Sequence, residues 1–191
     1  MRWSQLVNHW EQLGYKIHIV TASNSQDSSV LPSSQIVRIK ENIFGQLRGS
    51  LGRKGANLNK FKDSSEQNVL LKYLKKLISF IYRISFKYLQ WPDYAWTWIS
   101  RAYSEVNILI EQEGPFDAMI SVSHPFSSHL IAKKIKAKNP TIKWIADNGD
   151  PFSFLTASKP NNFYIYNKLN FRKEKEIFGM SDYASVTTEE T

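Results

Sequence analysis

The chain has 191 residues, a length typical of one domain, with 42% hydrophobic and 22% charged residues, which excludes a wholly disordered protein. Its formal net charge of +8 favours an anionic partner such as nucleic acid, a phosphorylated ligand or a membrane surface. It contains no cysteine, which excludes disulfides and thiolate metal sites, and no apolar run of the roughly 18 residues that a membrane span needs. Because the first residues also lack the apolar core of a signal peptide, we expect a cytoplasmic protein.

The first forty residues predict a helix followed by two short strands. Apolar residues recur at helical spacing over 3–13, and Gly14 is a typical helix stop. Apolar and polar residues alternate over 15–21, which predicts a strand, and a second short strand is predicted over 35–39. The polar run 22–34 between the two strands predicts a loop.

The next segment changes composition and then becomes helical. Residues 40–62 are rich in glycine, arginine and lysine and show no apolar periodicity, so we expect a flexible loop there. From 64 to 88 apolar residues return at helical spacing. A separate face of that helix carries four cations: Lys72, Lys76, Arg83 and Lys87. Beside Phe80 and Phe86 this face suits an anionic lipid surface, and a solvated face on a core helix is the alternative.

The second half of the chain alternates helices and strands. Asp93 is placed to cap a helix that runs to about Gln112 and ends at Gly114. The elements predicted after it are a strand at 117–122, a helix at 125–138, a strand at 142–146, a helix at 163–178 and a strand at 182–187. This alternation predicts an α/β fold, a Rossmann-like doubly wound parallel sheet covered by helices on both faces.

The order of elements departs from that fold at its start. A doubly wound domain usually opens with a strand and a glycine-rich turn, followed by its first helix. Here the first predicted helix has no strand before it, and few residues follow the last predicted strand. We therefore expect a fragment whose sheet lacks its first strand.

Polar side chains gather after two of the predicted strands. Ser123, His124 and Ser127 follow one strand, and Asp147 and Asp150 follow the next. Because ligands of open parallel sheets bind beyond the carboxyl ends of the strands, we expect these side chains to line one substrate site. Ser127 and the free N–H groups at the start of its helix could hold hydroxyl or phosphate oxygens, and the aspartates could accept hydrogen bonds from sugar hydroxyls. Turn and cap chemistry is the alternative for the aspartates, and an ordinary loop histidine is the alternative for His124.

The usual sequence signatures of nucleotide, metal and hydrolase sites do not occur. The four histidines share no metal-ligand spacing, so no metal site is predicted.

Several runs of residues carry a resemblance in their order along the chain. The two longest are Ser121-Val-Ser-His-Pro-Phe-Ser-Ser-His-Leu130 and Lys143-Trp-Ile-Ala-Asp-Asn-Gly-Asp-Pro-Phe152. Shorter ones are 2–21, Trp91-Pro-Asp93 with the tryptophan-rich stretch after it, 116–121 and 174–190. Together they resemble the N-terminal domain of glycosyltransferase family 4 proteins over nearly the whole chain. Gly149 and Phe152 replace the family's usual Arg and Trp, and His124 stands where relatives commonly have Pro.

The resemblance implies that residues 1–191 are the acceptor-side domain of a two-domain enzyme with the glycosyltransferase B fold. A C-terminal domain, absent here, would bind the sugar nucleotide, so this chain alone would be inactive and would bind no cofactor. The implied reaction is hexosyl transfer to a saccharide or lipid-linked acceptor in polysaccharide biosynthesis, peripherally at the inner face of the cell membrane. No catalytic residue is assigned, and His124 is a weak candidate.

Two other function classes stay open. One is a basic module that binds nucleic acid through residues 40–62 and the cationic helix, although no nucleic-acid-binding motif occurs and we do not expect that partner. The other is a non-catalytic interaction domain of a truncated gene.

Overall fold

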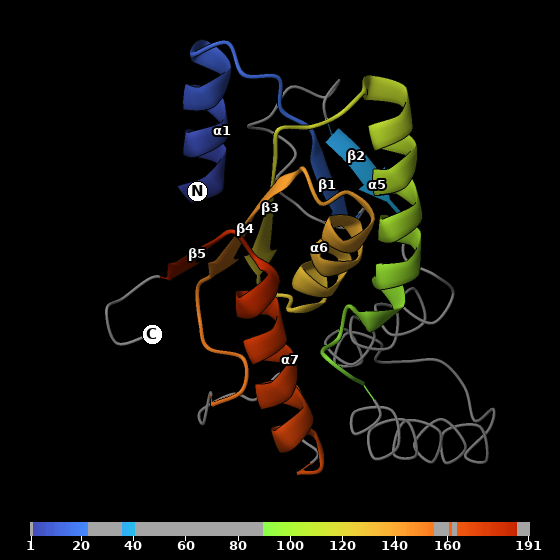
Figure 1. Ribbon diagram of the computed structural model, residues 1–191, viewed down its shortest axis with the longest axis vertical. Helices are drawn as coiled ribbons and strands as arrows, with labels where there is room; N and C mark the ends of the chain where they lie inside the picture. Colours follow the sequence, from blue (N-terminus) through green and yellow to red (C-terminus); the bar gives the residue numbers. More distant parts are fainter. Residues whose placement is uncertain (1, 23–35, 41–89, 155–160, 162–163, 187–191) are drawn as a thin grey trace, which may run out of the picture.

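The computed structural model describes residues 2–22, 36–40, 90–154, 161 and 164–186 (Figure 1). Residues 41–62 of the predicted flexible loop lie outside these ranges. The predicted helix over 64–88, with its cations Lys72, Lys76, Arg83 and Lys87, lies outside them too.

The strands form two small parallel sheets. In the first, β1 (Ile19–Ala22) pairs with β2 (Ile36–Ile39). In the second, β4 (Lys143–Asn148) lies between β3 (Ala118–Ser123) and β5 (Tyr183–Val186). Because every pairing is parallel, the carboxyl ends of neighbouring strands lie at the same edge of each sheet.

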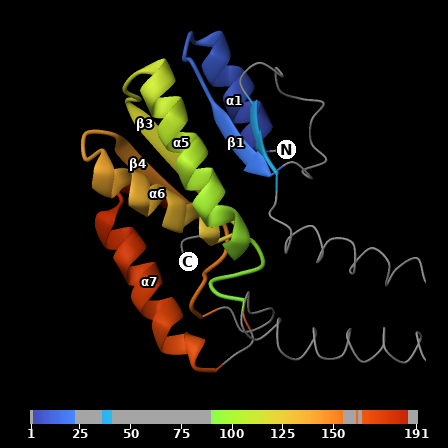
Figure 2. The same ribbon diagram turned by 90° about the vertical axis from the view of Figure 1, so that its right-hand side faces the viewer.

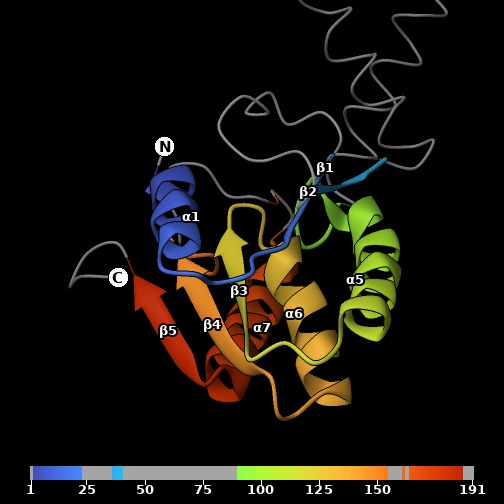
Figure 3. The same ribbon diagram turned by 90° about the horizontal axis from the view of Figure 1, so that it is seen from above.

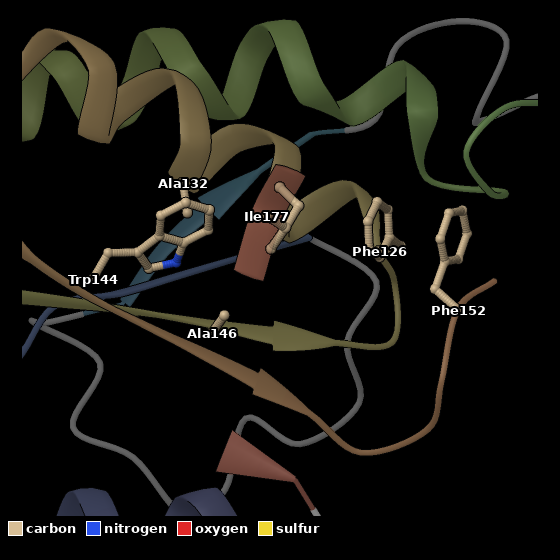
Figure 4. Packing of buried hydrophobic residues seen from close by; sticks show 6 residues of the cluster. All are labelled: Phe126, Ala132, Trp144, Ala146, Phe152 and Ile177. Carbon is tan, nitrogen blue, oxygen red and sulfur yellow. The ribbon is translucent and has the colours of Figure 1, made fainter. Parts of the chain in front are cut away.

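Helices cover both sides of the strands. On one side lie α5 (Ile99–Glu113), α6 (Ser127–Lys138) and α7 (Tyr166–Met180), and on the other lies α1 (Arg2–Gln12), as Figures 2 and 4 show. A short 3-10 turn, η3 (Trp96–Trp98), leads into α5. Figure 3 shows the strands of the second sheet side by side, with α6 and α7 on one side of them and α1 on the other. The α/β class and the parallel pairing predicted from the sequence are confirmed.

Most element boundaries follow the periodicity of the sequence. The first helix ends before Gly14 and α5 ends before Gly114, and both glycines have a positive φ that other residues rarely adopt. The predicted strand at 15–21 is half wrong, because pairing starts only at Ile19, opposite the first residue of β2. Before that point the side chains interact elsewhere: the Lys16 ammonium donates to a Glu113 carboxylate oxygen at 2.5 Å.

One buried cluster joins the second sheet to α6 and α7. Figure 4 shows its six members: Phe126, Ala132, Trp144, Ala146, Phe152 and Ile177. Trp144 fills the space between β4 and α6, and its indole N–H donates to the Ser121 hydroxyl oxygen at 2.8 Å. The rings of Phe126 and Phe152 stack with their centroids 3.7 Å apart, which fixes the loop after β4 against the start of α6.

A second cluster ties the first sheet to the same helical layer. It comprises Ile39, Ala102, Ile131, Ile135 and Ile142. Since α6 contributes to both clusters, the two sheets share one layer of helices. Within the described residues, no helix is both long enough and apolar enough to cross a membrane.

Candidate functional site

The carboxyl ends of β3 and β4 bring the two predicted site segments together. Ser123 and Asn148, the last residues of the two strands, are partners in the parallel register. Just beyond them, His124 Nε2 lies 3.5 Å from a carboxylate oxygen of Asp150. The side chains of His124 and Asp150 are 35% and 62% exposed, so the pair is open to a ligand.

Both side chains of this pair have atoms that can bind a ligand. The contact with Asp150 uses His124 Nε2, which leaves Nδ1 of the ring as an acceptor or donor for an approaching group. The Asp150 carboxylate offers further lone pairs that can accept hydrogen bonds from a ligand. An imidazole beside a carboxylate can bind a hydroxyl group and can accept its proton.

Ser127 is placed differently from its predicted role. Its backbone N–H donates to Asp93 Oδ2 at 2.9 Å, and its hydroxyl donates to Asp93 Oδ1 at 2.7 Å. Ser127 is 0% exposed and Asp93 is 1% exposed, so both polar groups of the serine are engaged inside the protein. The start of α6 therefore already carries a carboxylate, where we expected a ligand oxygen.

The contact also corrects the role predicted for Asp93. Its Oδ1 accepts the N–H of Ala95 at 2.8 Å, but α5 begins only at Ile99 and has no side-chain cap. Asp93 instead complements the N–H groups and positive dipole end of α6, 34 residues further along the chain. Asp93 thereby attaches the Trp91-Pro-Asp93 segment to the start of the helix that follows His124.

Three polar side-chain atoms of the last residues of β3 and β4 and of the first turn of α6 are buried. They are Ser123 Oγ, Asn148 Oδ1 and His129 Nε2, and the side chain of Asn148 interacts with the His129 ring. Asp147 is buried as well, so of the five predicted substrate-binding residues only His124 and Asp150 are exposed. Ser123 and Asp147 lie below the surface that a ligand would meet.

His129 is part of the sheet–helix core. Its Nδ1 lies 2.7 Å from the Ser121 hydroxyl, which itself accepts the indole N–H of Trp144. Burial lowers the pKa of His129 to about 4, although the side chain of Asn148 and the charge of Asp147 oppose that shift. The ring is thus neutral at pH 7.

A second buried carboxylate holds the loop that carries Asp150. Glu174, on the inner face of α7, accepts the N–H of Phe152 at 2.7 Å and the N–H of Ser153 at 3.1 Å. The Ser153 hydroxyl donates to the same carboxylate. Because these are backbone contacts, Glu174 fixes the path of the chain just after Asp150.

Side-chain amides attach the Trp91-Pro-Asp93 segment to α7. The indole N–H of Trp91 donates to Asn170 Oδ1 at 2.9 Å, and Asn161 Nδ2 donates to the carbonyl of Pro92 at 2.7 Å. Asn161 and Asn170 also bond to each other. The supports of the site thus come from residues that the sequence did not single out for this purpose, and only for Asn170 and Glu174 could a polar residue on the apolar side of a predicted helix have been a signal.

Searches against known protein families, curated proteins and solved structures found no match. Among the residues that the structure describes, no three His, Asp or Glu side chains come together as a metal site. The geometry at the carboxyl ends of β3 and β4 therefore carries the functional argument.

Proposed function

We propose that the chain is the acceptor-side domain of a sugar-nucleotide-dependent glycosyltransferase of the hexosyltransferase type, acting in polysaccharide or lipid-linked saccharide synthesis. The observation that carries the proposal is the exposed His124–Asp150 pair at the carboxyl ends of adjacent parallel strands. The carboxylate of Asp93 already occupies the start of α6, so phosphate would find a negative charge there. Such a site suits a neutral ligand rich in hydroxyl groups.

The strand arrangement supports the doubly wound fold that such a domain would have. The two sheets are both parallel, and their cores share α6. One further parallel strand between β1 and β3 would join them into a single sheet of order β2-β1-x-β3-β4-β5. Helices would then flank that sheet on both sides, as a doubly wound domain requires.

In this proposal the exposed pair binds and orients the acceptor. A hydroxyl of the saccharide would donate to His124 Nδ1, while Asp150 would hold the ring through Nε2 and stabilise it once it is protonated. Neighbouring hydroxyls would donate to the remaining lone pairs of Asp150. The sugar-nucleotide donor and its leaving diphosphate would belong to a C-terminal domain, and no cofactor would bind to this one.

The proposal includes an acceptor presented at an anionic membrane surface on the cytoplasmic side. A lipid-linked acceptor is embedded in that surface, so a domain that binds it benefits from attachment there. The cations Lys72, Lys76, Arg83 and Lys87 stay part of this proposal as a basic helix face.

Saccharide binding tests the proposal directly. We would record saturation-transfer NMR on the 191-residue chain with a panel of neutral and anionic oligosaccharides, and compare His124→Ala and Asp150→Asn with the wild type. Asp117→Asn, an exposed aspartate outside the site, is the matched control. We expect signals from some oligosaccharides, at least about tenfold weaker binding in either site variant, consistent with the loss of one charged hydrogen bond, and no change in the control. Absence of binding by every oligosaccharide, together with salt-dependent binding of duplex DNA, would instead support the nucleic-acid module.

A further inference from the structure

The solvent-facing side of α7 has an unusual composition. Five residues at helical spacing form it: Lys168, Phe171, Arg172, Lys175 and Phe178. We call this set the basic–aromatic face. Phe171 is 64% exposed and Phe178 is 36% exposed, so two large rings stand beside three cations on one surface.

The basic–aromatic face is not needed to pack α7 onto the protein. The buried residues of the helix, Asn170, Glu174 and Ile177, lie on the opposite side. Figure 2 shows α7 at the border of the molecule with α6 on its inner side. A substitution in the basic–aromatic face therefore does not change the buried contacts that hold α7 against the protein.

The three cations of this face keep their charge available. None of Lys168, Arg172 and Lys175 forms an ion pair with another residue that the structure describes. The nearby acid, Glu176, is held by Lys133 and Lys173, and these ammonium groups lower its pKa to about 2. No acidic residue belongs to the basic–aromatic face.

We propose that the basic–aromatic face of α7 docks the protein onto an anionic lipid bilayer. Lipid phosphates complement the three cations, and the acyl boundary below them accommodates Phe171 and Phe178. The adjoining Tyr164 and Ile165, 78% and 52% exposed, extend the apolar part beyond the start of the helix. A nucleic acid or an acidic protein surface would also pair with the three cations, but it would bury less of the two exposed phenylalanine rings.

This inference rests on the membrane part of the proposed function and assigns a surface to it. It is independent of saccharide binding, because the basic–aromatic face does not include His124 or Asp150. It also differs from the basic helix face predicted around Lys72, which belongs to another segment of the chain.

Vesicle sedimentation of the 191-residue chain tests the docking surface. The vesicles contain either phosphatidylcholine alone or phosphatidylcholine mixed with phosphatidylglycerol, at low salt. One variant replaces the three cations (Lys168→Gln, Arg172→Gln and Lys175→Gln), and a second replaces the rings (Phe171→Ser and Phe178→Ser). A matched control removes three exposed cations elsewhere (Arg38→Gln, Lys40→Gln and Lys134→Gln).

We expect the wild type and the control to sediment with the anionic vesicles and not with phosphatidylcholine alone. Each cation near an anionic surface contributes about a fivefold factor in affinity at low salt, so the first variant should bind about 100-fold more weakly. The ring variant should still bind at low salt, but it should dissociate at a lower salt concentration than the wild type does. Salt screens the attraction between the cations and the lipids, and without the two rings no apolar contribution remains to hold the chain.

Three outcomes would overturn the inference. Wild-type chain that ignores anionic vesicles would defeat the whole membrane proposal, while oligosaccharide binding could still stand. Equal loss of binding in the cation variant and in the control would mean that net charge alone attracts the chain. Unchanged binding in both α7 variants, with loss on replacing Lys72, Lys76, Arg83 and Lys87 by Glu, would assign the membrane surface to the other helix.

Discussion

Replacing Asp93 by Ala should destabilise the fold. The carboxylate is 1% exposed and accepts three hydrogen bonds: from the N–H and hydroxyl of Ser127, and from the N–H of Ala95. Alanine would leave all three donors without their partner. The Ser127 hydroxyl can turn to another acceptor, but the two backbone N–H groups cannot.

The expected magnitude follows from these donors. A buried donor without a partner costs about 1–3 kcal/mol, and the part-buried N–H of Ala95 costs less than the buried N–H of Ser127, so the free energy of unfolding should fall by about 2–4 kcal/mol. Asp93→Asn should cost about 2 kcal/mol, because its amide keeps one acceptor oxygen but turns an N–H₂ group toward a donor. Ser127→Ala should cost about 1 kcal/mol, since it removes one hydrogen bond and leaves the Asp93 carboxylate with two donors.

Urea unfolding, followed by circular dichroism, would rank the three variants. The order of destabilisation should be Asp93→Ala, then Asp93→Asn, then Ser127→Ala, with Asp117→Asn unchanged as the exposed control. The double variant should fall short of the sum of Asp93→Ala and Ser127→Ala, because the two side chains share one interaction. A loss below about 1 kcal/mol for Asp93→Ala, or strict additivity, would refute the role assigned to this contact.

Three further predictions concern the buried groups around the site. The pKa of His129 is about 4 in the folded state against 6.5 in the unfolded one, so the unfolded chain takes up the proton first. The free energy of unfolding should therefore fall by about 2–3 kcal/mol as the pH drops from about 7 to 4.5, and His129→Gln should flatten that dependence in urea titrations. Glu174→Gln should speed amide hydrogen exchange at Phe152 and Ser153 while leaving exchange in β3 unchanged. If both amides exchange at the same rate in the variant as in the wild type, the role assigned to Glu174 is wrong. Trp144→Phe should cost about 1–2 kcal/mol in urea unfolding, because it removes the N–H that Ser121 accepts and leaves part of the indole volume empty, and no loss would contradict that packing.

The element pattern could be predicted because it depends on residues close in sequence. Apolar spacing gave α1, α6 and α7 within a few residues, and Gly14 and Gly114 marked two helix ends correctly. The first half of the strand predicted from residue 15 was wrong. The alternation of apolar and polar residues is a property of one segment, whereas a strand also needs a second segment to pair with. The partner strand β2 begins only opposite Ile19, and nothing in residues 15–18 could reveal that.

The candidate site was predictable only in part, for the same reason. The rule that parallel strands end at one edge correctly brought His124 and Asp150 together. It could not reveal that Ser127 is closed off by Asp93, since the two residues lie 34 positions apart and meet only through packing. A serine that is free to bind a ligand and a serine that binds a remote carboxylate have the same local sequence.

The two buried carboxylates have a common consequence for the exposed pair. Asp93 fixes the backbone just after His124, and Glu174 fixes the backbone just after Asp150, each through N–H groups of the chain. A carboxylate loses much solvation on burial, so placing one beneath each loop is costly unless charged hydrogen bonds offset the loss. A loop that presents a side chain to a weakly held ligand benefits from such support, because conformational entropy already lost on folding is not lost on binding. The two buried carboxylates, more than the identity of either exposed residue, therefore support the proposal that this edge of the sheet binds a ligand.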